Sequence, residues 1–165
     1  MQKLEIRKAV SGEASRVAVV LYESFIEYKS FYSDEAFAVT TPASEQIQRS
    51  INECSVLVAL QDEVIVGTAA AMPCRDSYYV QSMGVLPLAR GLRIGEILLK
   101  RIEDDASGEC YKRLFLSTTP FLHRAIKLYE RFGFRRTGEP PHELFGTPLF
   151  TMEKILETTT RKPGL

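Results

Sequence analysis

Apolar residues along this chain recur with two different spacings, and segments of the two kinds alternate. Leu4 and Ile6 stand between charged neighbours, and this alternation predicts a first strand at residues 3–10. Two β-branched runs separated by a short polar turn predict a hairpin after the first helices. The strands expected beyond the first cover residues 55–60, 64–72, 77–86, 113–119, 134–139 and 149–156.

Helical spacing of apolar residues predicts four helices, at residues 11–28, 40–53, 93–107 and 122–133. Ser11 and Glu13 are candidate caps of the first helix, and Pro42 is expected in the first turn of the second. Gly133 is expected to end the fourth. The apolar faces expected of the last two helices are formed by Ile94, Ile97, Leu98 and Ile102, and by Ala125, Leu128, Tyr129 and Phe132.

The alternation of strands and helices over 165 residues predicts a single α/β domain. We expect this domain to cover residues 1–156 and to be followed by a polar tail at residues 157–165. Glycine and proline gather at residues 138–148, which predicts a turn-rich loop between the last two strands.

Composition narrows the classes of partner. Lysine plus arginine and aspartate plus glutamate both number 21, so no global positive charge is available to hold nucleic acid. Cys54, Cys74 and Cys110 have no spacing typical of a disulfide framework or a zinc site, so we expect no metal and a reducing cytoplasm. The charged start is unlike a signal peptide, and no apolar run approaches the roughly 20 residues of a membrane span. We therefore expect neither a membrane nor a nucleic-acid partner.

Arginine and glycine gather where the strand at 77–86 gives way to the helix at 93–107, in Arg90, Gly91, Arg93 and Gly95. Free N–H groups and the helix dipole attract an anion to such a helix start, and glycine lets it approach the main chain. The alternative is a solvated basic start with glycines that serve the turn. Neither the Walker lysine nor the G-x-G-x-x-G fingerprint is present, so the pattern does not support nucleotide binding of either kind.

Two motifs together resemble the GNAT N-acetyltransferase superfamily. The stretch "VLPLARGLRIGEILL" is similar to the family's acyl-CoA pyrophosphate loop, with Arg90 and Gly95 matching and Arg93 in place of the middle glycine. The stretch "AIKLYERFGF" is similar to the family's later Ala-x-x-Leu-Tyr-x-x-x-Gly-Phe segment. Leu122 departs from the family, where many members carry an asparagine. The two motifs stand in the family's order, and the element order covers nearly the whole chain.

The resemblance implies a mixed, mostly antiparallel central sheet flanked by helices. It implies that the strands at 77–86 and 113–119 separate and hold the pantetheine arm of acetyl-CoA. Members of the family often form homodimers, so the resemblance implies that a homodimer is possible. The cofactor-binding residues that the resemblance implies are Met83, Gly84, Val85, Arg90, Gly91, Leu92, Arg93, Ile94, Gly95 and Glu96.

Tyr129 matches the family's general acid. Amine attack on a thioester expels a thiolate, whose parent thiol has a pKa of roughly 8.5, and a phenol within hydrogen-bonding distance can supply the proton. The alternative is that Tyr129 belongs to the core, because it lies on the apolar face of its helix. The glutamate that many members carry in the strand at 77–86 is missing. The groups that could replace it as a base are Glu23, Glu27, Asp76, His123 and His142.

The expected reaction is transfer of an acetyl group from acetyl-CoA to a primary amine of a small molecule or peptide, by direct attack in a ternary complex. A non-catalytic acyl-CoA-binding module and an acetyltransferase for a protein N-terminus of the ribosomal-protein alanine type are the alternatives. The acceptor site implied by the resemblance is walled by the first two helices and the late loop. An aromatic series in that region either lines it or belongs to the core: Tyr22, Phe25, Tyr28, Phe31, Tyr32 and Phe37.

Overall fold

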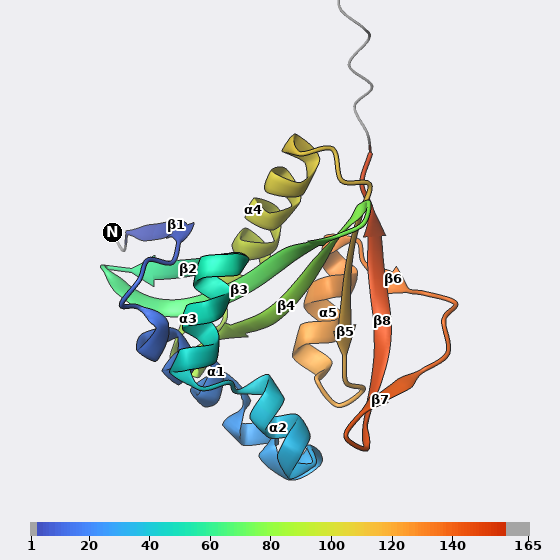
Figure 1. The fold of residues 1–165 in the computed structure, drawn as a ribbon, viewed down its shortest axis with the longest axis horizontal. Helices are drawn as coiled ribbons and strands as arrows, with labels where there is room; N and C mark the ends of the chain where they lie inside the picture. Colours follow the sequence, from blue (N-terminus) through green and yellow to red (C-terminus); the bar gives the residue numbers. More distant parts are fainter. Residues whose placement is uncertain (1–2, 158–165) are drawn as a thin grey trace, which may run out of the picture.

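A computed structural model describes residues 3–157 and confirms a mixed sheet with helices on both faces (Figure 1). The strands are β1 Leu4–Lys8, β2 Ser55–Gln61, β3 Val64–Cys74, β4 Ser77–Val85, β5 Arg113–Thr118, β6 Arg135–Arg136, β7 His142–Leu144 and β8 Thr147–Ile155. The helices are α1 Ala14–Phe25, α2 Asp34–Thr40, α3 Ser44–Glu53, α4 Ile94–Gly108 and α5 His123–Phe132, with short 3-10 turns η1 Ile26–Phe31 and η2 Pro87–Ala89. The expected polar tail lies outside the described residues, apart from residue 157.

The sheet consists of two antiparallel halves joined by one parallel pair. Its strand order is β1-β2-β3-β4-β5-β8-β6, and β7 pairs with the other part of β8. Only β4 and β5 run parallel among the described strands, and α4 forms the crossover between them. The sheet is therefore mostly antiparallel, since every other pair of neighbouring strands is antiparallel.

Strand β2 shows why its sequence is apolar at successive positions. Leu57 and Ala59 belong to the core cluster shared with α4 and α5, whereas Val58 and Leu60 belong to the cluster shared with α1 and α3. Successive side chains of a strand point to opposite faces, so a central strand covered on both faces has no polar side. Within the described part of the chain, no helix is long and apolar enough to cross a membrane.

Several expectations about single elements are wrong. Helix α2 was not expected, and β7 lies within the segment expected to be a loop. Pro42 precedes α3 instead of lying in its first turn.

Two expectations about side chains are also wrong. Ile97 is 36% exposed and Leu99 is buried in its place, because the buried stripe of α4 is set by packing on β3 and β4. Neither of the caps expected for the first helix forms a side-chain cap, because the Glu13 carboxylate pairs with Arg7.

Gly84 brings α1 close to strand β4. A Cβ atom at Gly84 would lie 2.9 Å from the Ser24 Oγ and 3.3 Å from Leu21 Cδ2. The strand irregularity itself falls just before it, where the register slips opposite Thr68–Ala70 and Ser82 takes a φ of 50°. The missing side chain of Gly84 therefore serves the packing of α1 on the sheet.

Gly84→Ala should lower the free energy of unfolding by about 1–3 kcal/mol, because α1 has to shift to admit the methyl group. Gly138→Ala is the matched control, since nothing lies within 4 Å of the added atom and no positive φ is required there. Urea denaturation of both variants measures the difference. Equal stability of the two variants would show that α1 does not constrain Gly84.

Candidate functional site

The two halves of the sheet separate where β4 meets β5. Their pairing consists of Ser77 with Arg113, Tyr78 with Leu114 and Tyr79 with Phe115, and it stops there. Both strands continue, β4 to Val85 and β5 to Thr118, and Figure 1 shows them diverging below the shared end. The expected separation of these two strands is confirmed, and it leaves one edge of each strand without a neighbouring strand.

The loop after β4 supplies a helix start suited to an anion. Gly91 has a φ of 88°, and Arg93 has a φ of 61° at the N-cap of α4. Arg93 thus adopts a left-handed backbone conformation that favours glycine, at a cost on the order of 1 kcal/mol. No side chain caps α4, so its first-turn N–H groups remain available.

A cleft of about 720 Å³ lies between this loop, the end of β4 and helix α5. Its walls include every expected cofactor-binding residue except Leu92, and they also include Tyr129. Leu92 is not part of the wall and is about half exposed. The structure therefore brings together residues from β4, the loop and α5 that are up to 48 positions apart in the sequence, from Met83 to Arg131.

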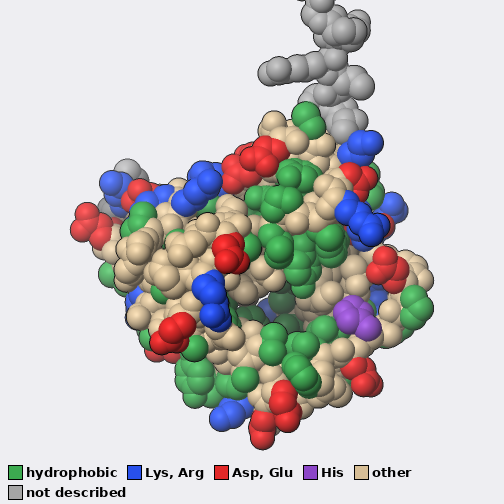
Figure 2. Space-filling model, in the orientation of Figure 1, with side chains coloured by type: hydrophobic (Ala, Val, Ile, Leu, Met, Phe, Trp, Pro, Cys, Tyr) green, Lys and Arg blue, Asp and Glu red, His purple; other side chains and the backbone are tan. Residues whose placement is uncertain are grey.

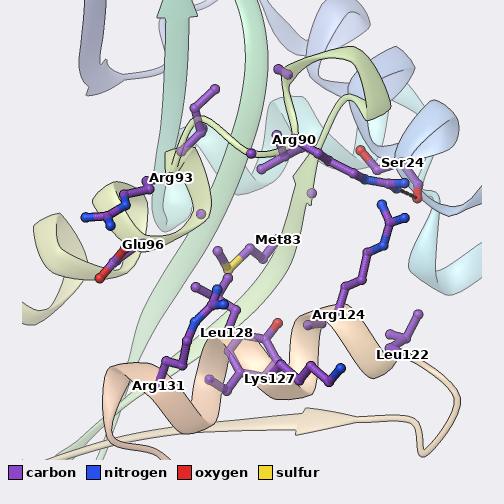
Figure 3. A pocket seen from close by; sticks show the side chains of 18 of the residues that line it. Ser24, Met83, Arg90, Arg93, Glu96, Leu122, Arg124, Lys127, Leu128 and Arg131 are labelled. Carbon is purple, nitrogen blue, oxygen red and sulfur yellow. Dashed lines mark hydrogen bonds between the residues drawn. The ribbon is translucent and has the colours of Figure 1, made fainter.

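Arg90 is held by the segment that follows α1. Its guanidinium pairs with the Glu27 carboxylate and donates a hydrogen bond to the Ser24 carbonyl oxygen at 3.2 Å. These two contacts anchor the loop to the end of α1 and to η1. Arg90 was expected to contact the anion directly. The structure shows that it also braces the loop against the other side of the cleft (Figure 3).

Helix α5 contributes three cationic side chains that the sequence analysis did not single out. Arg124, Lys127 and Arg131 recur three and four residues apart, so they share one face of α5, and all three line the cleft. None of them has an acidic partner within the described part of the chain. The spacing was visible in the sequence, but only the position of α5 shows which way this face points.

Positive charge is therefore concentrated around the cleft of a chain with no net charge. Figure 3 shows the Arg124 side chain extending from α5 toward Arg90, and Arg131 extending toward Met83. The walls carry five cationic side chains and the single carboxylate of Glu96. Unpaired guanidinium groups that converge on one space repel one another, and an anion between them removes that repulsion.

Gly95 lies where α4 approaches α5. A Cβ atom there would lie 2.7 Å from Leu128 Cδ2 and 3.2 Å from the terminal carbon of Met83. The expectation that this glycine only gives an anion access to the backbone is incomplete, because the same position also receives the Leu128 side chain. Substitutions at Gly95 therefore change helix packing and the cleft together.

Tyr129 is a core residue that also borders the cleft. It is 8% exposed and packs against Phe134 with ring centroids 5.8 Å apart, as a core residue does. It also lines the cleft on the α5 side. Burial, and to a smaller degree nearby Tyr32, raises the pKa of the Tyr129 phenol above its usual range. The phenol therefore keeps its proton at neutral pH.

The candidate bases are dispersed. Asp76 adjoins the closed end of β4 and β5, since its carbonyl accepts from the Lys112 N–H, and it is thus removed from the open end. Glu27 is occupied by Arg90. The His142 ring nitrogen lies 3.5 Å from the Ser117 hydroxyl in the separated half of β5. Among the described residues, no cluster of three or more His, Cys, Asp or Glu is placed to hold a metal ion.

Comparisons with known proteins point to one family. The model of the acetyltransferase (GNAT) family matches residues 19–134. An IAA acetyltransferase of Azospirillum brasilense is 38% identical over 84 residues, which is about half of this chain and 55% of that protein. The uncharacterized N-acetyltransferase YjgM of Escherichia coli is 27% identical over 135 residues, 78% of this chain and 80% of that protein.

Solved structures agree on the fold. The PaiA N-acetyltransferase of Thermoplasma acidophilum, in complex with coenzyme A, superimposes with a TM-score of 0.81. The comparison covers 93% of this chain and 99% of that one at 20% sequence identity. This likeness shows that the two chains share the arrangement of strands and helices, including the elements that border the cleft.

Arg124→Gln should weaken CoA binding about three- to tenfold at low ionic strength, because one charge that converges on the cleft is removed. The difference from wild type should shrink in 0.5 M salt as exposed charges are screened. Arg101→Gln is the matched control, since Arg101 lies on α4 and pairs with Asp105 outside the cleft wall. Calorimetry that gives both variants the same CoA affinity would contradict an anion site on α5.

Proposed function

This chain belongs to the GNAT acetyltransferase family, and from that premise we propose that it transfers an acetyl group from acetyl-CoA to a primary amine. The amine attacks the thioester directly while both substrates are bound. The observation that carries the proposal is the cleft between the end of β4, the start of α4 and helix α5, which connects a basic helix start with a buried tyrosine.

The chain's own residues fit the parts of CoA. The uncapped first turn of α4 and the cations of the loop and α5 suit its phosphates. The strand edges left free beyond Tyr79 and Phe115 suit the amides of the pantetheine arm.

Acetyl-CoA supplies the acyl group as a thioester, and the protein supplies position and a proton. Tyr129 holds that proton on its phenol, because burial raises its pKa. Proton transfer to the departing sulfur lets it leave as a thiol instead of a thiolate. The ring of Tyr129 is fixed by Phe134 and the surrounding core, so the hydroxyl is held in place before the substrates bind.

The acceptor side has to remove a proton from an alkylammonium, whose ordinary pKa is near 10. Gln81 in β4 cannot accept it, and its side-chain amide donates to the Met72 sulfur at 3.6 Å. His142 is the candidate base that the structure places beside the separated half of β5. The proposal therefore assigns the thiolate proton to Tyr129 of α5 and the ammonium proton to a group beside β5.

Tyr129→Phe separates the chemical role from the packing role. The variant keeps the ring and loses the hydroxyl, so turnover should fall at least about tenfold while CoA affinity stays within about twofold of wild type. Steady-state kinetics on the best amine of a panel measures the first quantity and calorimetry with CoA the second. Wild-type turnover would make Tyr129 a core residue only.

The pH dependence of kcat offers a second check on the same phenol. A general acid acts only in its protonated form, and burial raises the pKa of Tyr129 above the usual value of about 10. Loss of the Tyr129 proton should therefore not reduce kcat below about pH 10. A decline at lower pH that is present in wild type and absent in Tyr129→Phe would contradict the protonated donor.

Turnover distinguishes the proposal from its alternatives. A non-catalytic acyl-CoA-binding module should bind CoA and release no thiol with any acceptor. An N-terminal acetyltransferase should accept peptides and leave small amines unmodified. The proposal predicts that CoA forms in step with an acetylated amine, and release of CoA by hydrolysis alone would count against it.

A further inference from the structure

The cleft borders an aromatic cluster at Tyr28. Tyr28 of η1 lines the cleft, and its ring centroid lies 6.3 Å from that of Phe121. Phe121 in turn stacks on Phe31 at 5.3 Å and meets the edge of Tyr32 at 4.9 Å. The aromatic residues are thus continuous from the cleft wall to the surface, and Figure 2 shows hydrophobic side chains gathered around a hollow on this face.

Part of this surface is exposed to an extent that core packing does not explain. Phe31 and Phe145 are each 61% exposed. Tyr32, by contrast, is buried, and burial raises its pKa to about 12. Buried Tyr32 and Phe37 are the core of the cluster, so Phe31 and Phe145 are not needed to fill it.

Phe145 occupies a position that disfavours its own side chain. It has a φ of 47° and Gly146 has a φ of 83°, in the tight turn that joins β7 to β8. Such turns favour asparagine, aspartate or glycine, and a bulky residue there costs on the order of 1 kcal/mol. A strained and exposed aromatic ring contributes nothing evident to stability, which indicates a role in binding.

The turn between β7 and β8 is joined by hydrogen bonds to the segment that carries Phe31. The Ser33 N–H donates to the Thr147 hydroxyl at 3.0 Å, and that hydroxyl contacts the Ser33 side chain at 3.4 Å. Phe31 and Phe145 each stand two residues before one partner of this contact. Figure 1 shows the β7–β8 hairpin tip beside α2 at the same end of the molecule. The segments that carry the two exposed rings are therefore held together.

Leu122 extends the apolar character into the cleft itself. It follows Phe121, is buried, lines the cleft and caps α5 without a side-chain hydrogen bond. The wall of the cleft beside Tyr28 is thus apolar, which suits an acceptor with an apolar body.

We propose that the acceptor is a small arylalkylamine, whose ring binds among Tyr28, Phe31, Phe121 and Phe145 while its amine points toward Tyr129. This inference rests on the proposed function for the reaction, and it adds the class of the acceptor. Phe145 is a specificity-determining residue, retained at the expense of turn geometry.

The test compares 2-phenylethylamine with ethanolamine, which has a primary amine and no ring. Wild type should prefer 2-phenylethylamine by at least about tenfold in kcat/KM, the scale expected of one buried aromatic contact. Phe31→Ala and Phe145→Asn should each reduce that preference about fivefold or more. Val64→Ala removes an exposed apolar side chain from the distant β2–β3 hairpin and should leave it unchanged.

Phe145→Asn also has a readout that does not depend on activity. Asparagine suits the left-handed turn, so the melting temperature should stay equal to wild type or rise while the acceptor preference falls. Calorimetry of 2-phenylethylamine with the CoA-bound protein should show weaker binding in both aromatic variants. A destabilised Phe145→Asn variant with intact preference would overturn the assignment.

Three further outcomes would overturn the inference. One is equal use of ethanolamine and 2-phenylethylamine by wild type. Another is a preference for peptide N-termini over both amines. The third is light scattering that shows a dimer dissociated by Phe31→Ala, which would assign the surface to a second copy of the chain. If CoA binds but no amine is acetylated, the proposed function fails, and binding of 2-phenylethylamine to the CoA-bound protein still decides the inference.

Discussion

The early end of pairing between β4 and β5 is the constraint on which the rest of the site depends. Two antiparallel halves of a sheet meet through three residue pairs, and both strands then continue apart. Strand β5 keeps its other neighbour, β8, over six residue pairs, while β4 stays with β3 through a register slip at Ala69. Each strand is therefore held firmly on one side and free on the other, which keeps the gap open without a ligand.

The elements that border the gap are fixed by packing unrelated to binding. Helix α4 is anchored in the core through Ile94, Leu98 and Ile102, so its first turn is held at the cleft. Helix α5 is anchored through Tyr129, and this burial both immobilises the phenol and raises its pKa. The same hydrophobic contacts thus build the core and raise the pKa of the phenol beside the cleft.

Much of the fold could be predicted from the chain, because most strands and helices carry a clear apolar period and the loop motif stands between two of them. The features that could not be predicted are those that a local sequence pattern does not determine. Ile97 and Leu99 both fit a helical stripe, and only contact with the sheet decides between them. The short helix α2 has too few turns to show a period, and the cations of α5 gain meaning only from the direction in which that helix faces. The site residues remain predictions that the geometry supports.

Hydrogen exchange with and without CoA tests directly whether CoA binds along β4 and the loop, because it reports on individual segments of the sheet. Saturating CoA should slow exchange at residues 80–85 of β4 and at residues 90–96 of the loop and α4, because the free strand edge and the helix start gain CoA as a hydrogen-bond partner. Residues 55–61 of β2, which are paired on both sides, should not change. Bound CoA with no protection at 80–85 would contradict a cofactor site between β4 and β5.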